Sequence, residues 1–249
     1  MDYLQLATQY LEPKLQGKYI YLDSILPILQ TLDSDFEITE IGKSVQGRGI
    51  HQVKIGKGTT KILMWSQMHG NESTTTKGLF DFFNFLKSDN EIANRIKSDY
   101  TLLCIPMLNP DGAFFYTREN ANKVDLNRDA FNATQPEMQI LHSIYKSFQP
   151  DYCYNLHDQR TIFGTEGFNL PATVSFLSPA FNESRDYNDV RLKAIHVINK
   201  MNNVLQCYIP NQVGRFDDGY NVSCTGDYFT TQNTPTVLFE AGHFVGDYD

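Results

Sequence analysis

The stretch KILMWSQMHGNE, residues 61–72, decides the fold of this chain. It begins with an apolar run of the length of a buried strand, and His69 and Glu72 follow directly after that run. Gly70 and Asn71 permit a sharp turn, so an imidazole and a carboxylate three residues apart can bind one cation. A third ligand would complete a zinc site with an open position for water, whereas a lone pair of this kind is more often a structural hydrogen bond.

Charge and composition limit the partners of the chain. The 249 residues are 41% hydrophobic, which suffices for a sizeable core. The net charge of -8 argues against nucleic acid, and no apolar run has the length needed to span a membrane. Residues 1–5 carry neither a basic nor an apolar segment, so we expect a cytoplasmic protein unless a secretory signal has been removed. The sequence does not indicate an oligomeric state.

The hydrophobic pattern predicts an α/β fold. Residues 36–45 and 50–55 indicate a β-hairpin around a Gly-rich turn, and from residue 61 onward strand-like runs alternate with helical periodicity. This alternation is typical of a sheet that is covered by helices on both faces. Thr134 and Glu137 predict a capping box before one helix. The expected strands are 62–67, 101–108, 152–156 and 236–239, and the expected later helices lie around 79–86, 138–148 and 194–205.

Polar residues follow the ends of all four expected strands. They are His69 with Glu72, the segment Asn109–Gly112, His157, and Glu240. In open α/β sheets the site lies beyond the carboxyl ends of the strands, so these residues can converge although they are far apart in sequence. Two histidines and one glutamate suit a zinc ion, and the second glutamate is free for acid–base chemistry.

These motifs resemble the zinc metallocarboxypeptidases of the carboxypeptidase A type, in the same order over residues 61–240. The resemblance implies a mixed, mostly parallel central sheet with helices on both faces, in three layers. With no linker in the sequence, we expect a single catalytic domain over 1–249, in which two short helical patterns form an N-terminal helical cap at 1–35 before a peptidase core at 36–249. Because the chain ends nine residues after Glu240, we favour a fragment truncated at the C-terminus over a compact member. The matching segments are HGNE (69–72), TREN (117–120), VDLNR (124–128), NLHD (155–158) and LFE (238–240).

The resemblance implies a role for each residue near the metal. His69, Glu72 and His157 would bind one Zn²⁺ per chain, and Glu240 would be the general base. Asp125 would accept a hydrogen bond from the non-ligating nitrogen of His69, which fixes the tautomer of a ligand. Taken alone, Asp125 could equally be a loop aspartate that binds backbone amides.

The resemblance also implies the substrate contacts. Arg118 would stabilise the oxyanion, while Asn127 and Arg128 would hold a terminal carboxylate, which an arginine fork binds bidentately. Alone, Arg128 could belong to a solvated turn. Tyr220 is the best candidate for the family's mobile tyrosine. In the expected selectivity pocket, Asp227 could favour a basic side chain or be structural.

We therefore expect a zinc-dependent carboxypeptidase that acts on a peptide or peptide-like substrate with a free C-terminal carboxylate. One alternative is an N-acyl amino acid deacylase of the aspartoacylase type, and another is a peptidase of cell-wall peptides. A zinc-containing binding module without turnover is the non-enzymatic alternative.

Overall fold

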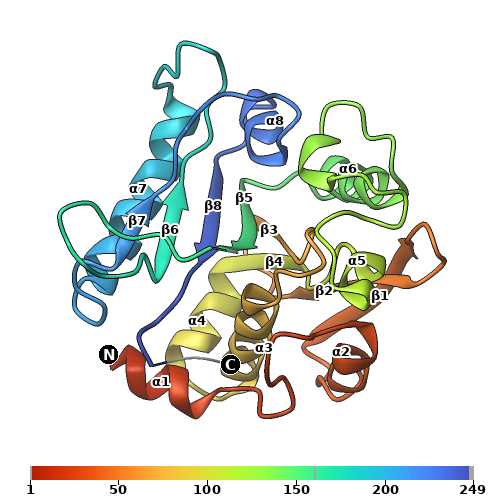
Figure 1. Ribbon diagram of the computed structural model, residues 1–249. Helices are drawn as coiled ribbons and strands as arrows, with labels where there is room; N and C mark the ends of the chain where they lie inside the picture. Colours follow the sequence, from red (N-terminus) through yellow and green to blue (C-terminus); the bar gives the residue numbers. More distant parts are fainter. Residues whose placement is uncertain (1, 160, 247–249) are drawn as a thin grey trace.

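The computed structural model describes residues 2–159 and 161–246. In this part of the chain eight strands form one mixed sheet, in the order β1-β2-β4-β3-β5-β8-β6-β7 (Figure 1). The strands are β1 (Phe36–Lys43), β2 (Gly49–Ile55), β3 (Thr60–Ser66), β4 (Tyr100–Ile105), β5 (Tyr152–Asp158), β6 (Val174–Leu177), β7 (Val213–Arg215) and β8 (Thr236–Ala241). The helices are α1 (Tyr3–Gln9), α2 (Leu22–Leu29), α3 (Thr74–Lys87), α4 (Glu91–Asp99), α5 (Pro110–Phe115), α6 (Pro136–Phe148), α7 (Asp189–Leu205) and α8 (Thr225–Thr231), with a 3₁₀ turn at Leu126–Arg128.

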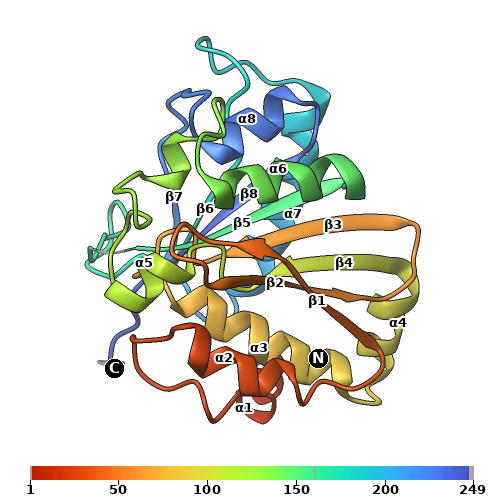
Figure 2. The same cartoon turned by 90° about the vertical axis from the view of Figure 1, so that its right-hand side faces the viewer.

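The centre of the sheet is parallel. Strands β4, β3, β5 and β8 are neighbours that run in the same direction, whereas β1, β2 and β6 each make an antiparallel pair. Figure 2 shows α2 and α3 below the sheet and α6 and α8 above it. The predicted fold, a mixed and mostly parallel sheet with helices on both faces, is therefore confirmed.

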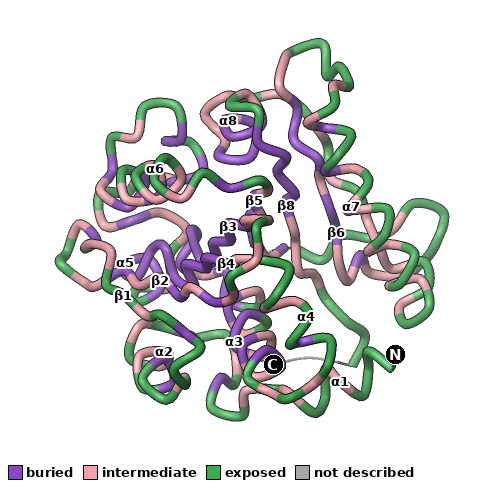
Figure 3. The backbone as a smooth tube through the Cα atoms, turned by 180° about the vertical axis from the view of Figure 1, so that it is seen from behind, coloured by how far each residue is buried: buried purple, intermediate pink, exposed green. Residues whose placement is uncertain are grey.

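The burial of β3 explains the apolar run that precedes His69. Ile62 and Met64 pack on the face covered by α3, and Leu63 and Trp65 pack on the face covered by α6 and α8. A strand buried on both faces reads as a continuous apolar segment, without the alternation of a half-exposed strand. Figure 3 shows these central strands buried beneath exposed outer helices.

The predicted hairpin forms, and a buried aspartate attaches it to the rest of the molecule. Strands β1 and β2 pair antiparallel, with an irregularity between Glu40 and Gly42. Asp111, at the start of α5, accepts hydrogen bonds from Ser44 Oγ (2.8 Å) and Gln46 N (2.8 Å) and pairs with Arg48 Nη1 (2.6 Å).

The predicted capping box does not form. The Thr134 hydroxyl donates to Asp129 Oδ1, and Glu137 accepts from Val45 N and Asn120 Nδ2. Helix α6 begins at Pro136 without a side-chain cap, because both residues of the expected box bind other partners.

The N-terminal helices differ in how firmly they pack. Ile25, Ile28 and Leu29 of α2 belong to the core that α3 covers, whereas α1 buries no residue. None of the helices among the described residues has the length and apolarity that a membrane span requires.

Candidate active site

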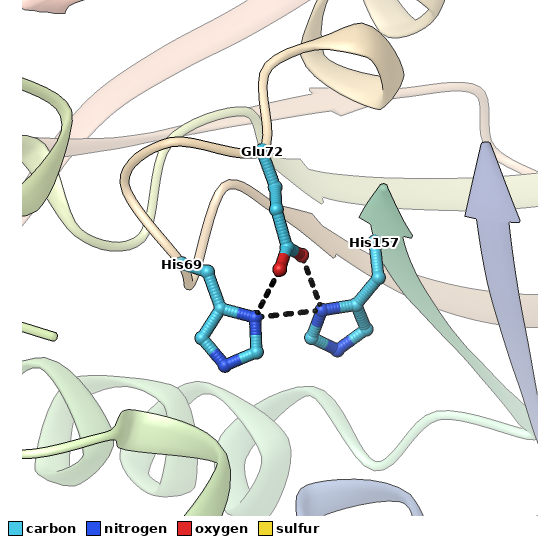
Figure 4. Close-up of side chains that lie close together, drawn as sticks. All are labelled: His69, Glu72 and His157. Carbon is cyan, nitrogen blue, oxygen red and sulfur yellow. Dashed lines mark hydrogen bonds and ion pairs between the residues drawn. The ribbon is translucent and has the colours of Figure 1, made fainter. Parts of the chain in front are cut away.

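The loop after β3 and the end of strand β5 bring His69, Glu72 and His157 together. His69 and Glu72 lie between β3 and α3, where Glu72 N donates to His69 O and closes a turn, and His157 lies near the end of β5. Both imidazoles face the carboxylate of Glu72 (Figure 4). His69 Nδ1 lies 2.8 Å from Glu72 Oε1, and His157 Nδ1 lies 2.8 Å from Glu72 Oε2. The two Nδ1 atoms are 3.2 Å apart, and one ligand atom from each residue lies within 4.8 Å of the others. All three side chains are buried.

The hydrogen bonds of His69 indicate that this group suits a cation. His69 Nε2 lies 2.9 Å from Asp125 Oδ1, so the carboxylate holds the ring proton on that nitrogen. In a neutral ring, Nδ1 is then an acceptor that faces an acceptor oxygen of Glu72, an unfavourable contact unless a proton or metal ion lies between them. Burial alone would lower the pKa of His69, but hydrogen bonds with Asp125 and Glu72 outweigh burial and raise it. Two imidazoles and a carboxylate are a donor set that zinc prefers.

Glu72 is fixed by groups on several elements. Asp158 N and Arg118 Nη1 each donate to its carboxylate, at 3.2 Å in both cases. Burial would raise the pKa of Glu72, but hydrogen bonds from His157 and His69 hold it well below the usual range. Glu72 is therefore ionised and positioned before any ligand binds.

Arg118 joins two of these acids. Its Nε donates to Asp125 Oδ2 at 3.0 Å while Nη1 contacts Glu72, and the side chain keeps 28% of its surface exposed. Burial would raise the pKa of Asp125, but His69 and Arg118 hold it well below the usual range. The predicted oxyanion residue thus lies beside the metal-ligand group.

Glu240 lies on the strand next to His157. The two residues are register partners in the parallel pair of β5 and β8. Burial, together with the nearby carboxylates of Glu72 and Asp158, raises the pKa of Glu240 to about 7. A carboxylate with such a pKa can both accept and return a proton near neutral pH.

Asn127 and Arg128 stand on the 3₁₀ turn that follows Asp125. Asn127 Oδ1 accepts from Thr225 N (2.9 Å), and Asn127 N donates to Asp125 Oδ1 (2.8 Å). Arg128 Nη1 donates to Asn127 O and lies 3.2 Å from Cys224 Sγ. Within residues 2–159 and 161–246, no acidic side chain forms an ion pair with Arg128. Its charge is therefore available to an anionic ligand.

One cavity of about 390 Å³ adjoins most of the predicted residues, which we call the first cavity. Its lining includes the metal-ligand group, Arg118, Asn127, Arg128 and Glu240. Tyr220 is not among the described residues that line it, although its neighbour Gly219 is. The predicted role of Tyr220 stays a prediction.

The segment Asn109–Gly112 does not line the first cavity, contrary to the expected convergence. Asn109 caps α5 through Gly112 N and donates to Met68 O at 3.1 Å. A Cβ on Gly70 would lie 1.8 Å from the carbonyl carbon of Gly112, so only glycine permits this close approach of the two loops. The segment therefore packs against the loop that carries His69 and does not face the first cavity.

Two polar residues that follow His157 directly had no predicted role, although Asp158 lies in the matching segment NLHD. Asp158 Oδ2 accepts from Thr74 N (2.5 Å) and Oδ1 from Thr75 N (3.1 Å), which caps α3 and ties it to β5. Gln159 donates to Ser175 Oγ at 2.9 Å and lines the first cavity. Their position directly after the predicted ligand His157 is the sequence feature that could have identified them.

Comparisons with known proteins identify the family of this chain. A family model described as zinc carboxypeptidase matches residues 23–161. Carboxypeptidase 2 of Trichophyton rubrum is 25% identical over 100 residues, which are 39% of this chain and 19% of that protein. Mouse carboxypeptidase M is 31% identical over 169 residues, which are 57% of this chain and 37% of that protein. The matches thus span less than two fifths of either relative.

Solved structures share the fold. The carboxypeptidase A of Helicoverpa armigera superposes with a TM-score of 0.71 at 16% identity, covering 99% of this chain and 73% of that one. The murein-tripeptide amidase MpaA of Escherichia coli O157 gives a TM-score of 0.53 at 15% identity, covering 83% of each chain. At these identities the likeness concerns the fold alone.

Proposed function

The chain belongs to the zinc carboxypeptidase family, and from this premise we propose that it is a zinc-dependent carboxypeptidase that hydrolyses the C-terminal peptide bond of peptides with a free carboxylate. The observation that carries the proposal is the buried group of His69, Glu72 and His157. It shares one cavity with Glu240 and with Arg128, which forms no ion pair with a described residue. These residues combine a metal site, a base and an anion-binding group.

The residues around the metal site have different roles in hydrolysis. A zinc ion held by His69, Glu72 and His157 would polarise the substrate carbonyl and lower the pKa of a bound water. Glu240 accepts the proton of the attacking water and returns it to the leaving amine, a task that its pKa of about 7 suits. Asp125 keeps the ring of His69 in the ligating tautomer.

The arginines act on the two charges of the substrate. Arg128, with the side-chain amide of Asn127 beside it, binds the terminal carboxylate and so selects peptides with a free C-terminus. Arg118 Nη2 makes no hydrogen bond with a described residue, and it donates to the oxyanion that develops at the scissile carbonyl.

The test is hydrolysis of a mixed peptide panel by the zinc-loaded protein, followed by mass spectrometry. We expect loss of single C-terminal residues from free-acid peptides and none from amidated ones. Glu240→Gln should lower kcat by about a thousandfold or more while zinc and peptide still bind. Undiminished turnover in that variant would refute the mechanism.

A second candidate is a peptidase of cell-wall peptides, which the structural likeness to a murein-tripeptide amidase favours. Cleavage of such peptides, with standard peptides left intact, would select this candidate. Hydrolysis of N-acyl amino acids alone would instead indicate the deacylase. Zinc and peptide binding without any turnover would indicate a binding module.

A further inference from the structure

The loop between α5 and α6 carries several residues of the candidate site. They are Arg118, Asp125, Asn127 and Arg128. Apart from its short 3₁₀ turn the loop contains neither helix nor strand, although all of residues 116–135 are described. Catalytic groups on such a loop keep their geometry only where hydrogen bonds and packing from other elements fix them. Two buried polar residues to which the proposed mechanism assigns no role, Asn120 and Glu137, supply such contacts.

Asn120, the last residue of the TREN segment, closes the turn that joins Arg118 to Asp125. Its backbone N donates to Val124 O at 3.0 Å, and its side-chain Oδ1 accepts from Val124 N at 3.1 Å. Lys123, inside this turn, has a left-handed backbone with a φ of 60°, which is costly for a residue other than glycine. Such a conformation persists where the surrounding contacts determine it, and here Asn120 makes those contacts.

The side-chain amide of Asn120 is held in turn by the start of α6. Its Nδ2 donates to Gln135 Oε1 at 2.9 Å and to Glu137 Oε2 at 3.1 Å. Asn120 and Gln135 are buried, and Glu137 is 0% exposed. The second oxygen of Glu137, Oε1, accepts from Val45 N at 3.1 Å in the turn between β1 and β2. One buried carboxylate therefore joins the loop of the candidate site to the hairpin.

The position of Arg118 depends on this turn. Arg118 lies two residues before Asn120, and its side chain contacts Asp125 through Nε and Glu72 through Nη1. Asp125 directly follows Val124, the residue that Asn120 binds. An oxyanion donor is effective only within about 3 Å of the developing charge, so a small displacement of the loop weakens its effect.

We propose that Asn120 and Glu137 are positioning residues for Arg118, the arginine that stabilises the oxyanion. This inference rests on the proposed function. Neither Asn120 nor Glu137 is among the described residues that line the first cavity, whereas Arg118 is, so both act through Arg118. Because the oxyanion exists only in the transition state, loss of this support lowers kcat more than it raises KM.

The test is Glu137→Gln in the zinc-loaded protein, with a free-acid peptide as substrate. Glutamine keeps the size of the side chain but has one acceptor oxygen, so it cannot accept from both Val45 N and Asn120 Nδ2. We expect kcat to fall by about tenfold, with KM and zinc content close to those of the wild type. Glu119→Gln is the matched control, because it makes the same change in the same loop at a half-buried side chain, and it should keep kcat.

A second variant keeps the test informative if Glu137→Gln fails to fold. Asn120→Ser retains a side-chain acceptor for Val124 N but is too short to reach Glu137. It removes the same contact, and we expect a similar fall in kcat. Wild-type kcat in both folded variants would overturn the inference and leave the proposed activity intact.

A double-mutant cycle separates positioning of Arg118 from a merely structural role. In the Arg118→Ala protein, Glu137→Gln should lower kcat no further, because the group that it positions is absent. An equal fall in the wild-type and Arg118→Ala backgrounds would overturn the inference, although carboxypeptidase turnover would still support the proposed function. A zinc-loaded wild type without any turnover would overturn the proposed function, and the inference with it.

Discussion

At the scale of a single residue, His69 links two acids of the site, because its two ring nitrogens lie beside different carboxylates. Asp125 lies 2.9 Å from Nε2 and Glu72 lies 2.8 Å from Nδ1. Motif spacing predicted His69 and Glu72 as a pair. The spacing of the motifs could not predict that Arg118 would contact both Asp125 and Glu72, since those contacts depend on the folding of a loop.

Zinc binding should weaken as the pH falls. The pKa of His69 is raised in the metal-free protein, and a protonated imidazole cannot bind a metal. We expect the affinity for zinc to fall by about tenfold or more between pH 8 and pH 6, with release of protons on binding. Calorimetry in two buffers of different ionisation enthalpy measures both effects. An affinity that does not change with pH would contradict the ligand assignment.

Asp227 should make the stability of the protein depend on pH. Burial raises the pKa of Asp227 from 3.8 to about 7. Between these two pH values the folded state therefore keeps a proton on Asp227 that the unfolded state has released. Stability therefore decreases as the pH rises from about 4 through 7, by roughly 2–4 kcal/mol. Urea unfolding at pH 5 and pH 8 should show a smaller decrease for Asp227→Asn than for the wild type. Equal decreases would show that Asp227 titrates normally.

At the scale of elements, the predictable strands were the long buried ones. Strands β3, β4, β5 and β8 have apolar runs and turn residues after them, whereas β6 and β7 have only 4 and 3 residues. Helix α4 buries only Ala93 and packs Ile96 against the core, so its apolar stripe is short. Helix α8 consists largely of weak helix formers and depends on Phe229, which packs between Trp65 and Tyr145.

The contact between the hairpin and α5 predicts unequal effects for its two charged partners. The side chain of Asp111 is fully buried and satisfies three donors, whereas that of Arg48 is 24% exposed. Asp111→Ala should cost roughly 3 kcal/mol, because buried donors lose their acceptor, and Arg48→Ala should cost less. Chemical denaturation of the two variants measures the difference. A larger loss for Arg48→Ala would contradict this account.

At the scale of the whole molecule, a metal ion would link elements that are distant in sequence. His69 and Glu72 follow β3, and His157 belongs to β5. A ligand that binds only the folded state stabilises it by about 2.7 kcal/mol at a hundredfold excess over Kd. We expect zinc to raise Tm by several degrees and a chelator to reverse the shift. In His157→Ala the shift should disappear, and an equal shift in that variant would place the metal elsewhere.

Strand β8 is the last strand among the described residues, yet it lies between β5 and β6 inside the sheet. During synthesis at about 5–20 residues per second, β6 has emerged several seconds before β8 is complete. Throughout that interval β5 and β6 present unpaired edges, which are templates for association with other chains. A chain released at Asn233 should therefore aggregate, as light scattering would show; a monodisperse product would contradict this. Glu240, the proposed base, lies on this strand, so under the proposed mechanism a nascent chain that lacks β8 would be inactive.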